Sequence, residues 1–179
     1  MTHRLIGLIF LAGAVALLAG CGTVTPKAYE QAEPRFVLED YFLGKTKAWG
    51  IFEDRKGQVQ RQFVVEITGA MDGDELVLTE DFVYADGEVS QRIWRVRRID
   101  EHRYEGRADD VDGVATGESY GNALYWSYIL RLPVGDDVYN VRFDDWMFLQ
   151  PDGVLLNRAR MSKFGIHLGE VTIAFQKVE

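Results

Sequence analysis

Short turn sequences containing glycine recur along the chain, and they limit its fold more than any other feature. The runs between them are rich in aromatic and β-branched residues, a composition typical of strands. An Asp-Gly pair forms a tight turn between neighbouring antiparallel strands. We therefore expect a series of hairpins. The turn sequences are Lys56-Gly57, Asp72-Gly73, Asp86-Gly87, Asp112-Gly113, Gly135-Asp136 and Pro151-Asp152-Gly153.

The turns divide the chain into ten predicted strands, preceded by a short helical turn between Phe36 and Leu43 that ends at Gly44. Elsewhere, helical periodicity does not persist. A meander this long usually closes, because closure removes exposed edge strands. We predict an all-β, antiparallel up-and-down barrel of eight to ten strands, a size that can hold one small ligand. The predicted strands are residues 47–55, 58–68, 75–84, 88–99, 102–108, 114–120, 123–132, 138–150, 154–164 and 166–177.

The register of two hairpins follows from their turns. A three-residue loop with Gly87 in the left-handed conformation pairs Leu78 with Trp94 and Glu80 with Arg92. The second hairpin turns at Pro151-Asp152-Gly153 and has the same loop class. Its predicted pairs are Phe143 with Met161, Asp145 with Ala159, Met147 with Asn157, Asp144 with Arg160 and Trp146 with Arg158. Each hairpin then has one face that is nearly apolar, as a barrel wall requires.

Two carboxylates, Glu80 and Asp145, lie on these apolar faces. Burying a charge costs several kcal/mol unless it is paired. Arg92 is the predicted partner of Glu80, whereas Asp145 has only Asn157 and Lys163 nearby. Two interpretations stay open: a polar clamp for a ligand, or a structural pair that fixes strand register. The candidate ligand-binding residues are Glu80, Arg92, Trp94, Trp126, Tyr128, Asp145 and Asn157.

The N-terminus has the pattern of an export signal. Arg4 precedes an apolar run that ends at Leu18, too short to span a bilayer comfortably. Leu18-Ala19-Gly20 before Cys21 resembles the cleavage site of bacterial lipoproteins, in which the cysteine thiol receives a diacylglycerol. An uncleaved membrane anchor with a buried cysteine is the alternative. By resemblance to enteric lipoproteins, Gly22 favours the periplasmic face of the outer membrane.

These features predict a signal peptide (1–20), a lipidated tether (21–34) and one barrel domain (35–179). The chain has 28 Asp and Glu against 20 Lys and Arg, a formal net charge of −8. A nucleic-acid-binding protein would normally carry a basic face, so we expect no nucleic-acid partner. We expect the chain to be attached to the membrane through the lipid on Cys21, and the sequence identifies no protein partner.

Other chemistries have weaker support. Gly117-Glu118-Ser119-Tyr120-Gly121 matches the G-x-S-x-G turn of hydrolases, but that turn needs a helix after it, and a strand is predicted there. A serine hydrolase using Ser119 is therefore a minor alternative. We expect no metal or cofactor, because only His102 and His167 follow Cys21, and the acidic turn at residues 109–112 is typical of a solvated loop.

Residues 36–50 resemble the start of a lipocalin barrel, in which a helical turn precedes a first strand with glycine and tryptophan. A second resemblance spans nearly the whole mature chain. The chain is similar to the bacterial lipoprotein family catalogued as domain of unknown function 3833, which supplies no catalytic residue. That resemblance is carried by Ala48-Trp49-Gly50, Glu80-Asp81-Phe82-x-Tyr84-x-Asp86-Gly87, Arg92-x-Trp94, Gly121-Asn122-Ala123, Asp144-Asp145-Trp146-Met147 and Met161-Ser162-Lys163-Phe164-Gly165.

Together these observations predict a protein that is not an enzyme and that binds or carries an apolar small molecule, such as a fatty acyl chain or lipid. The alternative is an envelope assembly or interaction factor whose barrel is filled by side chains.

Overall fold

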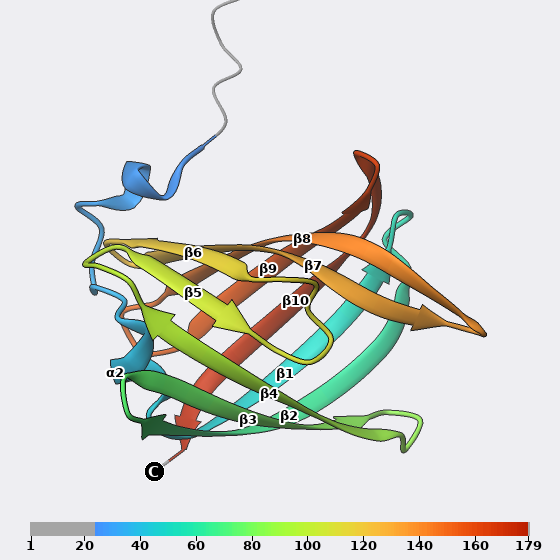
Figure 1. The fold of residues 1–179 in the computed structure, drawn as a ribbon, viewed down its shortest axis with the longest axis horizontal. Helices are drawn as coiled ribbons and strands as arrows, with labels where there is room; N and C mark the ends of the chain where they lie inside the picture. Colours follow the sequence, from blue (N-terminus) through green and yellow to red (C-terminus); the bar gives the residue numbers. More distant parts are fainter. Residues whose placement is uncertain (1–23, 179) are drawn as a thin grey trace, which may run out of the picture.

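Ten antiparallel strands follow one another in chain order and close into a barrel, as predicted (Figure 1). The computed structural model describes residues 24–178. Closure is complete because β1 pairs with both β2 and β10. The strands are β1 (Gly44–Asp54), β2 (Val59–Asp72), β3 (Glu75–Tyr84), β4 (Val89–Arg98), β5 (Arg103–Arg107), β6 (Ala115–Tyr120), β7 (Ala123–Val134), β8 (Asp137–Leu149), β9 (Leu155–Lys163) and β10 (Ile166–Val178).

Both predicted registers are confirmed. Leu78 lies opposite Trp94, and Glu80 lies opposite Arg92. The second hairpin has all five predicted pairs, including Asp145 with Ala159. Gly87 has a φ of 89°, in the left-handed region that its three-residue loop requires. Because side chains alternate between the two faces of a strand, the register also decides which residues face inward.

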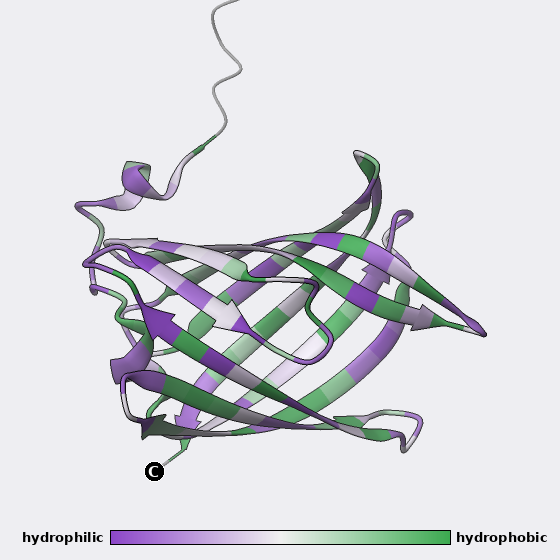
Figure 2. Cartoon of the chain, viewed as in Figure 1, coloured by the Kyte–Doolittle hydropathy of each residue, from purple (hydrophilic) through white to green (hydrophobic). Residues whose placement is uncertain are grey.

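Inward and outward residues alternate along the barrel wall, which shows as alternating green and purple bands in Figure 2. In β9, Leu155 and Ala159 are buried, whereas Arg158 and Arg160 are exposed. The outer face carries ion pairs such as Arg158 with Glu170, 2.6 Å apart. Asp144 lies opposite Arg160, as predicted, and its ion pair is with Arg142 of its own strand, at 2.8 Å.

The predicted helical turn is α2 (Leu38–Phe42), and it closes one end of the barrel (Figure 1). Leu38, Tyr41 and Phe42 are buried. The Tyr41 hydroxyl donates to the carbonyl oxygen of Phe175 in β10 at 3.1 Å. Gly69 in β2 permits this packing, because a Cβ there would stand 1.9 Å from the Phe42 carbonyl oxygen. The helix is therefore held by close backbone contact as well as by apolar burial.

A second short helix, η2 (Pro26–Tyr29), packs beside β6 and β7 on the outside of the barrel. The Tyr29 ring meets Trp146 and Phe148 edge-on, with centroid separations of 5.8 and 5.1 Å. This packing occupies part of the segment that the sequence predicted as a tether. The predicted signal peptide and Cys21 lie outside the described residues.

No helix within residues 24–178 has the length and apolar character needed to cross a bilayer.

Candidate binding site

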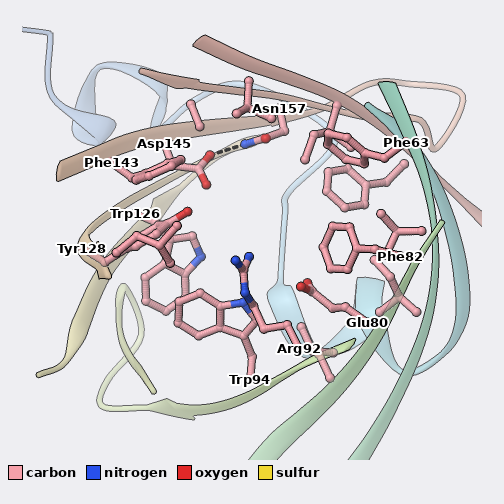
Figure 3. Close-up of a pocket in the computed structure, with 18 of the residues that line it drawn as sticks. Phe63, Glu80, Phe82, Arg92, Trp94, Trp126, Tyr128, Phe143, Asp145 and Asn157 are labelled. Atoms are coloured by element: carbon pink, nitrogen blue, oxygen red, sulfur yellow. Dashed lines mark hydrogen bonds between the residues drawn. The ribbon is translucent and has the colours of Figure 1, made fainter. Parts of the chain in front are cut away.

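A cavity of about 420 Å³ occupies the barrel interior. It begins at Leu38 and Phe42 of α2 and extends to Phe52 and Tyr84, near the hairpin loops of the opposite end. Its wall is mainly apolar and rich in aromatic rings (Figure 3). This cavity argues against the alternative of a barrel filled by side chains. The labelled aromatic residues are Phe63, Phe82, Trp94, Trp126, Tyr128 and Phe143.

The structure brings all the sequence-predicted ligand-binding residues of the barrel into the wall of this one cavity. They come from five strands, because inward-facing positions of β3, β4, β7, β8 and β9 converge inside a closed barrel. Their role in binding a ligand stays a prediction. The residues are Glu80, Arg92, Trp94, Trp126, Tyr128, Asp145 and Asn157.

Arg92 forms its ion pair with Asp110 and not with Glu80, its cross-strand neighbour. Its Nε and Nη2 donate to Asp110 Oδ2 at 2.9 and 2.6 Å. Asp110 lies in the connection between β5 and β6, where Val111 forms a bridge with Leu130 of β7. This bridge folds the connection against the barrel and brings Asp110 to Arg92.

The sequence did not predict Asp110 as a partner of Arg92, because the acidic turn at residues 109–112 is typical of a solvated loop. The second carboxylate oxygen of Asp110, Oδ1, is buried and has no hydrogen-bond partner among the described residues. No local signal identified the pair, since Arg92 and Asp110 belong to different hairpins.

Asp145 is buried, with 6% of its surface exposed. The Asn157 side-chain amide donates to Asp145 Oδ1 across the β8–β9 hairpin, as Figure 3 shows. The same amide donates to the Trp146 carbonyl oxygen at 3.2 Å. Asn157 is itself only 3% exposed, so the two side chains form a buried, hydrogen-bonded polar pair in an otherwise apolar wall.

Burial changes the acidity of both interior carboxyl groups. It raises the pKa of Glu80 to about 7, although the nearby Arg92 charge lowers it and the Asp110 and Asp145 charges add to the increase. Burial also raises the pKa of Asp145 to about 7, against the lowering effect of the Asn157 hydrogen bond. Loss of water around the charged form is the main cause in each case.

Ser119 is not placed as a nucleophile. It lies in β6, and the next element is β7 rather than a helix. Its hydroxyl donates to the Phe36 carbonyl oxygen at 2.9 Å, and the His102 Nδ1 contacts the Ser119 carbonyl oxygen, not its hydroxyl. The hydroxyl therefore supports the segment leading into α2.

Within residues 24–178, no three His, Cys, Asp or Glu side chains gather into a group that could hold a metal ion. Of the acidic turn, Asp110 is bound to Arg92, and Asp112 accepts a hydrogen bond from Asn140 at 3.2 Å.

The comparisons with known proteins identify the fold and a family. The model of the family described as "Protein of unknown function (DUF3833)" matches residues 15–177. No curated protein matches the chain. Among solved structures, the S-type phycobiliprotein lyase CPES from Guillardia theta is similar, with a TM-score of 0.59 and 6% sequence identity. The match covers 79% of this chain and 90% of the lyase chain.

This structural similarity overturns the prediction that the chain is not an enzyme. A barrel of the same fold belongs to a protein described as a lyase. The prediction rested on the absence of a recognised catalytic motif in the sequence. Since a fold of this kind also occurs in an enzyme, that absence does not exclude catalysis.

Proposed function

The chain belongs to the DUF3833 family of proteins of unknown function, and on that premise we propose that its barrel binds one elongated, mainly apolar small molecule. The observation that carries this proposal is the interior cavity of about 420 Å³. Ligand pockets of about 300–1,000 Å³ with apolar walls and a few polar groups are typical of small-molecule sites. The similarity to a phycobiliprotein lyase is consistent with a small-molecule ligand.

The geometry of the cavity favours a ligand with an alkyl or acyl chain. Phe63 and Phe82 line one side, and Trp94 and Trp126 stack with centroids 6.3 Å apart on another. At about 25 cal/mol per Å² of apolar surface buried, such walls favour a hydrophobic chain. The helix α2 closes one end, so we propose that the ligand enters between the hairpin loops at the other.

The proposal includes a lipid anchor on Cys21 and a location on the periplasmic face of the outer membrane. Its support is the sequence Leu18-Ala19-Gly20-Cys21 followed by Gly22. Metabolic labelling with an alkyne-tagged fatty acid tests it. We expect label on the wild-type chain and none on Cys21→Ser, and equal labelling of both would contradict the anchor.

Ligand binding is tested by native mass spectrometry of the protein purified from its own envelope, followed by calorimetric titration with 1-dodecanol. A matched pair of variants in β9 gives the control. Ala159 lines the cavity, whereas Leu156 points outward and is 45% exposed. Ala159→Phe should weaken dodecanol binding by about tenfold or more, corresponding to about 1.4 kcal/mol, and Leu156→Phe should leave it unchanged. Absence of binding to the folded wild-type protein would overturn the proposal.

A further inference from the structure

We propose that the polar group of the ligand is a protonated amine, held inside the barrel by the carboxylates of Glu80 and Asp145. This inference depends on the proposed function, because it names the chemistry of the ligand that the cavity takes. Its basis is the set of charged side chains that line the cavity and the partners that some of them already have.

Four charged side chains line the cavity: Arg61, Glu80, Arg92 and Asp145. Both basic groups are already bound to acids that are not part of the lining. Arg92 is bound to Asp110 at 2.6 Å. Arg61 pairs with Glu88 at 2.8 Å and Asp86 at 3.4 Å, close to the hairpin loops. The interior therefore keeps two carboxylates that form no direct ion pair with a cation of the described chain, although the Arg92 charge lies near Glu80.

The two carboxylates point into the cavity from opposite walls (Figure 3). Glu80 belongs to β3 and Asp145 to β8, and these strands are equally far apart in either direction around the closed sheet. Among the described residues, no hydrogen bond to the Glu80 carboxylate is formed. Asp145 receives one bond, from Asn157 to Oδ1, which leaves Oδ2 for another donor. Each carboxylate thus has acceptor capacity on the cavity side.

A cationic group on the ligand would give the two carboxylates the charged hydrogen-bond donor that they lack in the protein. An unpaired buried carboxylate is costly, and a charged hydrogen-bond donor placed beside it recovers part of that cost. The carboxylate of a fatty acid would instead add a negative charge next to Glu80, Asp145 and Asp110. The cavity therefore favours an amine-bearing amphiphile, with its chain against the aromatic wall, over a free fatty acid.

The test compares three ligands that share one chain: dodecylamine, 1-dodecanol and dodecanoate, titrated calorimetrically at pH 8 below their micelle-forming concentrations. At that pH an alkylamine, like a lysine side chain, is protonated. We expect dodecylamine to bind about tenfold or more tightly than 1-dodecanol, and dodecanoate to bind more weakly than both.

Each acid has a matched neighbour that faces outward, which gives the control variants. Glu80→Gln and Asp145→Asn should each reduce the preference for dodecylamine over 1-dodecanol about tenfold. Asp81→Asn and Asp144→Asn, which change outward-facing acids of β3 and β8, should leave it unchanged. Cooperative urea denaturation of each variant shows that it folds.

The outcomes separate this inference from the proposed function. If 1-dodecanol binds and dodecanoate equals or exceeds dodecylamine, the amine inference is wrong and the proposed function stands. An amine preference that survives in Glu80→Gln and Asp145→Asn would also overturn it. If none of the three binds to folded protein, both proposals fail.

Discussion

Arg92 in β4 is ion-paired with Asp110, a residue of the β5–β6 connection, with 2.6 Å between Nη2 and Oδ2. The two side chains keep 27% and 36% of their surfaces exposed. The pairing takes the guanidinium group away from Glu80, which lies directly across the β3–β4 hairpin. This pairing leaves Glu80 without a direct ion pair, so the cavity wall contains an unpaired acidic group.

The first prediction concerns that ion pair. Arg92→Met should lower the free energy of unfolding by about 2–4 kcal/mol, because Asp110 and Glu80 then lack a nearby cation. Urea denaturation measures the loss. Arg95→Met is the matched control from the outer face of β4, where Arg95 pairs with Asp72 and Glu75 at 3.1 and 3.2 Å. It should cost less than about 1 kcal/mol.

A double-mutant cycle checks the cause of that loss. Adding Asp110→Asn to Arg92→Met removes the unpaired charge, so the double variant should be more stable than Arg92→Met alone. Strictly additive losses would contradict the ion pair as the origin of the effect.

The second prediction concerns pH and Glu80. Its pKa is raised from 4.5 to about 7 in the folded protein, so the folded state holds the proton more tightly than the unfolded chain. This contribution to stability is complete below about pH 4.5 and is lost as the pH rises to about 7. Glu80→Gln cannot titrate, so at pH 8 it should be about 1–3 kcal/mol more stable than wild type.

Urea denaturation of the ligand-free protein between about pH 4 and pH 8 measures this difference. The gain of Glu80→Gln should shrink as the pH falls. Asp81→Asn is the control, because Asp81 is exposed and accepts a hydrogen bond from Gln91 at 2.7 Å. Parallel pH curves for Glu80→Gln and wild type would show that the Glu80 pKa is not raised.

The third prediction concerns the amide that supports Asp145. Asn157→Leu keeps the side-chain size but removes the only hydrogen bond that Asp145 receives among the described residues. The pKa of Asp145 should rise above about 7, since the bond stabilises the charged form. Carbon-13 NMR titration of the Asp145 carboxyl measures it.

The same variant should lose about 1–3 kcal/mol of stability at pH 8 and less at pH 5, where Asp145 is protonated in both proteins. In an Asp145→Asn background, the pH dependence of this loss should disappear. An unchanged Asp145 titration in Asn157→Leu would contradict the role given to the amide.

The fourth prediction concerns Ser119. Its hydroxyl is committed to the Phe36 carbonyl oxygen, so a serine-reactive fluorophosphonate should not label the folded protein. Ser119→Ala should cost about 1 kcal/mol in urea denaturation, as expected for one buried hydrogen bond. Labelling of wild type that is lost in Ser119→Ala would instead restore the hydrolase interpretation.

The sequence by itself determined the strands, the turns and which residues of each strand face the barrel interior. These features depend on local rules: period-two alternation, the need for glycine at positions such as Gly87, and one register that places apolar residues on a single face. For that reason Glu80 and Asp145 could be assigned to the interior before any tertiary contact was known.

Only the tertiary structure decided the ion-pair partners, the interior cavity and the docking of η2 on the outer wall. Arg92 pairs with Asp110 because the Val111–Leu130 bridge holds the β5–β6 connection, which is distant in sequence, against the barrel. Whether an interior is filled depends on the sum of side-chain volumes from all ten strands, and no single strand contains that information. Such features depend on contacts between residues far apart in the chain, whereas strand and turn patterns are set by neighbours.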